Sequence, residues 1–304
     1  MKKMIIAAAV ILLLLTGCDN RQKVGVCLRD ANDPLTGQYC QMLEQTLSDY
    51  TLTVVDAGND QSKQDQQVTR LLEEKVDILI LEPVMTSALD TITQLTQDKG
   101  VPVIFVNREP EGDGCYVGCN PAAIGGVQAR MVPQNADVNG DGILSYAYIT
   151  GPQDHLDAQL RSDGCAQALA DAGVQAQCLA LENTDWSREE GQLRCAAVLA
   201  KYGKDVEVIF CGNEALALGA IDAIKDGGRM VGENVYLYGI GGDRQSLMLI
   251  RSGDLSGTVS ENMPEQMEKL LVAVKAMLNG YMPGDGSYVN HIAIDQTNVE
   301  TYID

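Results

Sequence analysis

The strongest constraint on the fold is a regular alternation of short apolar runs with longer stretches of helical periodicity. Val101–Val106 is continuously apolar over the length of a strand, whereas Lys63–Glu74 repeats its apolar residues at helical spacing. Strands that are apolar throughout are typical of parallel sheets covered by helices on both faces. There are too many such units for one sheet, so the pattern predicts an α/β fold with two doubly wound parallel-sheet lobes.

The alternation gives approximate bounds for each element. Strands are expected at 24–28, 51–55, 76–81, 101–106, 115–117, 144–149, 176–181, 206–211, 235–240 and 257–259. Helices are expected at 37–48, 63–74, 87–97, 124–131, 157–172, 187–201, 214–226, 245–251 and 264–279.

The N-terminus has the layout of an export signal. Lys2 and Lys3 precede the apolar run Met4–Leu15, which is too short to span a membrane. The run ends in Leu-Thr-Gly-Cys, which resembles the lipobox of bacterial lipoproteins, so we expect residues 1–17 to be a lipoprotein signal peptide and Cys18 to be acylated. Residues 18–23 would then be a lipid-anchored tether. A plain secretory signal followed by a chance cysteine is the alternative.

Charge and length narrow the function further. The chain carries 22 basic and 42 acidic residues, a formal charge of −20, which repels phosphate backbones and argues against nucleic acid as a partner. The 304 residues suffice for two medium-sized domains, and we expect a monomer.

The nine cysteines do not form a recognisable metal motif. Apart from Cys18 they show no C-x-x-C pair and no paired zinc spacing. Several lie within apolar runs, as Cys27 and Cys211 do, where cysteine behaves as a small hydrophobic residue. We therefore expect mainly buried thiols, and the sequence leaves open one or two disulfides.

Polar residues gather directly after the apolar runs, where open α/β sheets bind their ligands. Their planar carboxylate, amide and guanidinium groups suit sugar hydroxyls, which both donate and accept hydrogen bonds, and the only tryptophan adds a stacking face. Taken singly, an Asp or Asn at such a position usually caps the next helix. Together they form a candidate ligand-binding set: Asp33, Asn107, His155, Asp157, Arg161, Trp186 and Asn213.

All of these residues except Asp33 lie in motifs that resemble the galactose/glucose-binding members of the type I periplasmic-binding family. The motifs are Gly58–Gln64, Asn107-Arg108-Glu109-Pro110, His155-Leu156-Asp157 with Arg161, Thr184-Asp185-Trp186, and Gly212–Gly219. The resemblance extends over nearly all of the chain after the signal.

The resemblance implies two lobes joined by three crossover segments. The first lobe would contain 24–118 and 261–290, and the second 119–260 and 291–304. Closure of the lobes would trap a monosaccharide, galactose-like or glucose-like, for delivery to the permease and ATPase of an ABC importer. A lipoprotein that senses sugar and signals to a membrane partner is the alternative that the sequence leaves open.

Two other functional classes fit the sequence poorly. A sugar-responsive repressor needs a basic helix-turn-helix before the first strand, where this chain has its signal. A glycosidase would use paired carboxylates such as Asp33 and Asp157, but these align with binding positions of the family.

Three positions depart from the family pattern. Leu35 replaces a stacking aromatic residue, Gly241 replaces an Asp, and Glu261 replaces a sugar-contacting Asn. We therefore expect altered hexose affinity or a different preferred sugar, and on this view Gly241→Asp tightens hexose binding.

A second site is suggested by calcium-loop spacing. Asp137, Asn139, Asp141 and the carbonyl of Ile143 follow the D-x-[DN]-x-[DN]-G pattern, but Tyr148 occupies the twelfth position in place of the usual acid. By resemblance to the family, Glu207 would complete a structural calcium site together with Ser145, which replaces a longer amide. A metal-free polar turn is the alternative.

Overall fold

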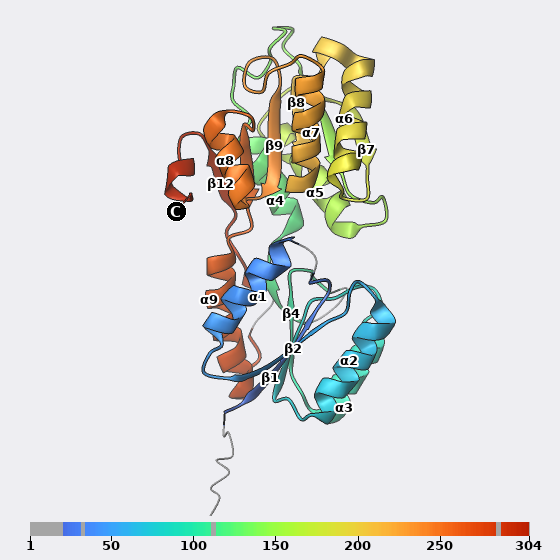
Figure 1. Cartoon of the computed structure of the whole chain (residues 1–304), viewed down its shortest axis with the longest axis vertical. Helices are drawn as coiled ribbons and strands as arrows, with labels where there is room; N and C mark the ends of the chain where they lie inside the picture. The colour runs from blue at the N-terminus through green and yellow to red at the C-terminus, as the bar shows by residue number, and fades with distance from the viewer. Residues whose placement is uncertain (1–20, 32–33, 111–113, 284–286, 304) are drawn as a thin grey trace, which may run out of the picture.

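Two lobes stacked along the long axis make up the molecule in the computed structural model (Figure 1). Residues 21–31, 34–110, 114–283 and 287–303 are described, except for the side chains of 34–36. In these ranges each lobe is built on one six-stranded sheet, with strand orders β11-β5-β4-β3-β1-β2 and β12-β10-β9-β8-β6-β7. All pairings are parallel apart from the antiparallel pair β10–β12, as the continuous apolar strands predicted.

The first lobe, at the bottom of Figure 1, is built mainly from the N-terminal third of the chain. Its elements are β1 (Lys23–Leu28), α1 (Pro34–Thr46), β2 (Thr51–Asp56), α2 (Gln61–Glu73), β3 (Ile78–Leu81), α3 (Asp90–Lys99), β4 (Val103–Val106), β5 (Cys115–Gly118), α9 (Met263–Leu278) and β11 (Ser287–Tyr288).

The second lobe contains the middle of the chain and its C-terminal strand. Its elements are α4 (Pro121–Arg130), β6 (Leu144–Thr150), α5 (Leu156–Asp171), β7 (Ala176–Asn183), α6 (Arg188–Tyr202), β8 (Val208–Cys211), α7 (Glu214–Asp226), β9 (Tyr236–Gly241), α8 (Arg244–Ser252), β10 (Gly257–Ser260) and β12 (Ile292–Asp295), with short 3-10 turns at Gly203–Asp205 and Val299–Thr301.

The chain passes between the lobes after β5, after β10 and after β11. Each predicted element is present with ends shifted by at most a few residues, whereas β11 and β12 were not predicted. β11 has only two residues, and β12 ends in an Asp and is buried at only one of its four positions, so neither forms a continuous apolar run. Within the described ranges, no helix has the length and apolar character needed to cross a membrane.

Each sheet is covered by helices on both faces, which creates separate cores. In the first lobe Val26, Ile80 and Val106 pack toward α1 and α9, whereas Cys27, Leu79 and Phe105 pack toward α2 and α3. The eight cysteines from Cys27 onward are free thiols, and all but Cys40 and Cys178 are buried, in line with the sequence.

Helices α4 and α5 pack at backbone contact, and this fixes the helix that carries two of the predicted site residues. A Cβ atom on Gly125 would lie 1.9 Å from the carbonyl oxygen of Arg161, and one on Gly164 would lie 2.1 Å from that of Ala122. Only glycine permits this approach. The position of α5, and with it that of Asp157 and Arg161, is therefore fixed by two glycines.

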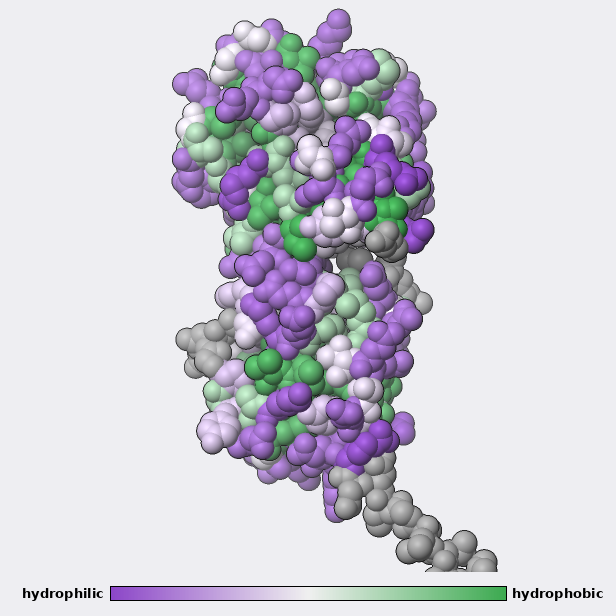
Figure 2. Space-filling view, turned by 90° about the vertical axis from the view of Figure 1, so that its left-hand side faces the viewer, coloured by the Kyte–Doolittle hydropathy of each residue, from purple (hydrophilic) through white to green (hydrophobic). Residues whose placement is uncertain are grey.

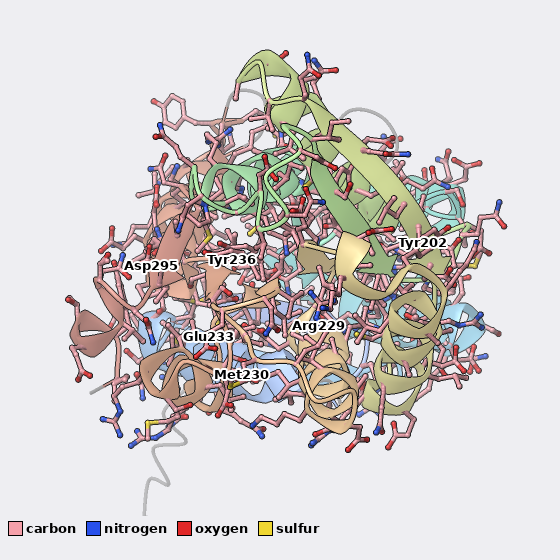
Figure 3. The ribbon with its side chains drawn as sticks, turned by 90° about the horizontal axis from the view of Figure 1, so that it is seen from above. Tyr202, Arg229, Met230, Glu233, Tyr236 and Asp295 are labelled. Carbon is pink, nitrogen blue, oxygen red and sulfur yellow. The ribbon has the colours of Figure 1, made fainter. Side chains whose placement is uncertain are left out.

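Two surface hollows lie away from the strand ends that face the other lobe. One, of about 410 Å³, is at the far end of the second lobe and is lined by Glu233, Tyr236 and Asp295, which Figure 3 labels. Beside it, Arg229 donates hydrogen bonds to the carbonyls of Gly203, Val206 and Asn234.

The other hollow, of about 460 Å³, runs along the outer face of α9 beside the exposed Val272 and Met282. Figure 2 faces this side and shows green hydrophobic patches among hydrophilic residues on both lobes. Neither hollow contains a residue of the predicted ligand set.

Candidate ligand-binding site

Most of the predicted ligand residues lie at strand ends that point toward the opposite lobe. β1 begins at the base of the first lobe and runs toward the second (Figure 1). β3 is parallel to β1 and β4 is parallel to β3, so the end of β4 brings Asn107 to the inner edge. Burial lowers the pKa of Arg108, and the negative charge of Asp157 opposes that shift. The ends of β4 and β6 are therefore within electrostatic reach of each other across the two lobes.

Trp186 is held in a strained conformation against two glycines. Its φ of 71° is in the left-handed region, which a bulky side chain rarely adopts. The indole lies over the ends of β6 and β8, where a Cβ on Gly151 would be 2.0 Å and one on Gly212 3.0 Å from its ring. Strain of this kind is common at binding sites, because the surrounding structure must enforce it.

Asn213 supports Trp186, and both ends of its amide are already used. Its Oδ1 accepts the Leu216 N–H at 2.8 Å and caps α7, while its Nδ2 donates to the Trp186 carbonyl at 3.3 Å. The capping role is the one that Asn commonly plays after a strand. Asn213 therefore positions the indole, and one of the two Nδ2 hydrogens is committed to the Trp186 carbonyl.

His155 and Asp157 begin α5 beside the indole. The His155 and Trp186 rings meet edge to face, with centroids 5.4 Å apart. Burial lowers the pKa of His155; Asp157 opposes the shift, whereas Arg108 and Arg161 add to it, so the imidazole is neutral at pH 7. Its Nδ1 is buried with no hydrogen-bond partner in the described structure.

Arg161 is held from two sides. Its Nη1 donates to the Gly212 carbonyl at 2.7 Å and its Nη2 to Glu261 Oε1 at 2.9 Å. Burial opposes its charge, but Glu261 and Asp157 outweigh burial and raise the pKa of the guanidinium. Of the donors that remain, Nε is buried and has no partner among the described residues.

Asn107 is oriented by a residue that the sequence did not point to. Gln266, which is 3% exposed on α9, donates from Nε2 to Asn107 Oδ1 at 2.8 Å and to the Val117 carbonyl at 3.1 Å. Because a carbonyl only accepts, the bond to Val117 fixes which end of the Gln266 amide faces Asn107. Asn107, with a φ of 61°, is therefore left with its Nδ2 donor free.

Arg108 is a second residue that belongs to the site on structural grounds. Its Nη1 donates to the carbonyls of Pro83 and Val84, and its Nε is buried without a partner in the described structure. The buried Glu82 accepts the Arg29 N–H at 3.2 Å and lies 3.9 Å from the Arg29 guanidinium. In the sequence, Arg108 could be recognised as a site residue by its position just after the apolar strand β4.

Two predicted positions of the first lobe cannot be placed. Asp33 lies outside the described residues, and the side chain of Leu35 is likewise outside them.

The geometry at Gly241 argues against the expected tightening of hexose binding by an Asp side chain. Its φ is 139°, and a Cβ there would lie 2.8 Å from Glu214 Cγ, so a side chain would run into α7 rather than toward the other lobe. The nearby Asp243 caps α8, accepting the Ser246 N–H at 2.7 Å. No Asp side chain at the end of β9 is therefore available to a ligand.

Glu214 fills the space beside these glycines. Its Oε1 accepts the Gly242 N–H and the Thr258 hydroxyl, both at 2.6 Å, while its Oε2 is buried without a partner in the described structure. A Cβ on Gly239 would lie 2.3 Å from that oxygen. Burial, opposed by these hydrogen bonds, raises the pKa of Glu214 to about 7.

The candidate calcium loop lies at the start of β6, the end of this strand that is opposite to Gly151 and Trp186. Asp137 accepts the N–H groups of Gly140 and Gly142 at 2.7 and 2.8 Å. The fully buried Glu207 accepts those of Asn139 and Ser145, both at 3.0 Å. Glu207 thus contacts the loop. In the described residues, however, no three His, Cys, Asp or Glu side chains gather closely enough to hold a metal.

A family model described as a periplasmic binding protein domain matches residues 24–282. The chain belongs to the periplasmic binding protein family. A curated relative in this family is the D-galactose/methyl-galactoside binding periplasmic protein of Haemophilus influenzae, 25% identical over 83% of this chain and 82% of the relative. This relative is a binding protein, not an enzyme.

Solved structures of periplasmic binding proteins share the fold. The solute binding protein of Actinobacillus succinogenes with bound D-allose superposes with a TM-score of 0.84 at 18% identity, over 93% of this chain and all of that one (100%). The protein of Bacillus halodurans with bound myo-inositol gives 0.81 at 24% identity, over 95% of this chain and 99% of that one. The two-lobed α/β fold expected from the sequence is confirmed.

Proposed function

We propose that this protein is the substrate-binding lipoprotein of an ABC importer and that it binds a small polyhydroxylated ring, a monosaccharide of the galactose or glucose type, between its lobes. The observation that carries the proposal is the set of unused hydrogen-bonding groups around Trp186. They come from both lobes, so a ligand that satisfies them holds the lobes together.

These unused hydrogen-bonding groups suit a ligand with hydroxyls rather than a purely apolar ligand. In the described structure Arg161 Nε and Asn107 Nδ2 are free donors, and the carboxylate of Asp157 makes no hydrogen bond. A hydroxyl accepts from such donors and donates to such a carboxylate. The face of the Trp186 indole suits the C–H face of a ring.

The relatives define a set of ligands to test. The ligands of the relatives described above are D-galactose or methyl-galactoside, D-allose and myo-inositol, which share a six-membered ring with several hydroxyls. Because Gly241 offers no side chain, we expect galactose and glucose to bind with fewer charged contacts than the family pattern provides.

The transport role includes an anchor and membrane partners. The family places the protein outside the cytoplasm, and the sequence Leu15–Cys18 supports lipidation at Cys18. The permease and ATPase of an importer would then receive the ligand at the membrane surface. Cys18→Ala should leave the protein unacylated; an acylated, processed form of that variant would contradict the anchor.

Calorimetry with D-galactose, D-glucose, D-allose, D-ribose and myo-inositol tests the proposal. At least one ligand should bind, and Asp157→Asn should weaken it by about tenfold to a hundredfold, because a charge-assisted hydrogen bond is lost. Asp154→Asn is the matched control, since Asp154 is exposed on the same loop. Equal losses in both variants would contradict the assigned role of Asp157.

A further inference from the structure

Glu261 occupies an unusual position for a carboxylate, in the crossover segment directly after β10. Its Oε1 lies 2.9 Å from Arg161 Nη2, and its backbone carbonyl accepts the Cys119 thiol at 3.5 Å. Both partners of the ion pair are shielded, with side chains 15% and 24% exposed. A shielded ion pair is screened little by salt, so its charges act strongly on anything bound beside it.

Glu261 is the carboxylate paired directly with a guanidinium of the site. The guanidinium groups whose charges act on Arg108, His155 and Arg161 belong to Arg29, Arg108 and Arg161. The carboxylates that act on the same three residues belong to Glu82, Asp157 and Glu261. Of these carboxylates, Glu261 lies at hydrogen-bond distance from Arg161 and therefore offsets its charge most directly.

We propose that Glu261 is a specificity-determining residue that restricts the site to uncharged ligands by neutralising Arg161. The inference rests on the proposed function, because it concerns the ligand of the same site. Glu261 also holds the guanidinium in place: Nη2 donates to Glu261 and Nη1 to Gly212, so both Nη nitrogens of the fork that would grip a carboxylate or phosphate are already engaged.

Removing the charge of Glu261 should open the site to anions. Glu261→Gln keeps the shape and an oxygen that accepts from Arg161, but it leaves one positive charge unbalanced. At the separation of close side chains, one charge in a shielded site changes the affinity for an anion by about tenfold or more. Affinity for a neutral ring should change much less.

The test compares D-glucose with D-glucuronate and D-galactose with D-galacturonate by calorimetry. The wild type should prefer the neutral member of each pair, and Glu261→Gln should shift each ratio toward the acid by about tenfold. Glu265→Gln is the matched control: Glu265 lies four residues further along, pairs with Lys269 at 3.2 Å, and should leave the ratios unchanged. Glu261→Asn provides a second variant if Glu261→Gln folds poorly.

A second measurement does not depend on the natural ligand. Inorganic phosphate should raise the unfolding midpoint of Glu261→Gln more than that of the wild type, since an anion can reach the freed guanidinium edge. Unchanged ratios together with no phosphate stabilisation in the folded variant would overturn the role of Glu261. If no sugar binds the wild type but phosphate stabilises Glu261→Gln selectively, the proposed function fails and the role of Glu261 stands.

Discussion

Gln266 Nε2 lies 2.8 Å from Asn107 Oδ1, which joins α9 to the end of β4 across 159 positions of the chain. The bond orients the Asn107 amide with its oxygen toward Gln266 and its Nδ2 donor away from it, and Nδ2 makes no hydrogen bond in the described residues. It thereby determines what the ligand must offer at this point, an oxygen that accepts.

Replacing Gln266 by Leu should weaken ligand binding through Asn107. The Asn107 amide would be free to rotate, and the buried Val117 carbonyl would lose its bond from Gln266, so we expect a loss of about threefold to tenfold in affinity and about 1–3 kcal/mol in unfolding free energy. Calorimetry and denaturant unfolding measure the two effects. Gln94→Leu is the control, because the Gln94 amide bonds only the surface residue Asp98 in the described structure. Unchanged affinity in Gln266→Leu would contradict the orienting role.

Gly241→Asp should destabilise the protein rather than tighten hexose binding. The residue has a φ of 139°, and its Cβ would lie 2.8 Å from Glu214 Cγ, so we expect a loss of about 1–3 kcal/mol in unfolding free energy. Combining Gly241→Ala with Glu214→Ala should recover part of the loss caused by Gly241→Ala alone, because the clash is removed and the backbone strain is not. A stable Gly241→Asp variant with tighter galactose binding would refute this reading.

Glu214 should make the protein less stable as the pH rises toward neutrality. Its pKa is raised from 4.5 to about 7, so between these values the folded state binds more protons than the unfolded state. The contribution is fully present below about pH 4.5 and is lost as the pH rises through about 7, and it amounts to roughly 3 kcal/mol. Glu214→Gln lacks this titrating group, so its unfolding free energy, measured with denaturant from pH 4.5 to 8, should fall less with rising pH than that of the wild type. An identical slope in both proteins would contradict the buried proton.

Calcium should stabilise the protein if the loop from Asp137 to Ser145 holds a metal. A ligand that binds only the folded state raises the unfolding midpoint, and Asp141→Ala should abolish the rise. Thermal unfolding in calcium and in chelator measures it, and Asp163→Ala, on the exposed face of α5, is a control. Identical midpoints in the wild type would favour the metal-free turn, which the backbone hydrogen bonds to Asp137 and Glu207 already close.

The sequence predicts the sheets well because their signal is local. Apolar runs such as Val208–Cys211 are buried along their whole length, so the run of apolar residues in the sequence marks the strand directly. The strands β11 and β12 are short and complete their sheets through pairing with distant segments, which no local pattern records.

The site is only half predictable for the same reason. Asp157 and Trp186 follow strands, and the topology of parallel sheets brings strand ends together. The direction of a side chain at Gly241, the bond from Asn213 to Trp186 and the support from Gln266 depend on contacts between segments far apart in sequence. Glu261 was expected to contact ligand, and its pairing with Arg161 becomes visible only in three dimensions.

Emission from Trp186, the only tryptophan of the chain, is the most direct test of whether the ligand binds beside this indole. The indole is half-buried beside His155, with its ring against Gly151 and Gly212, so a ring stacked on it must change its surroundings. Titration with the ligand that calorimetry identifies should change the intensity or wavelength of the emission, with a midpoint equal to the calorimetric Kd. Heat of binding without any change in Trp186 emission would place the ligand elsewhere and contradict the site described here.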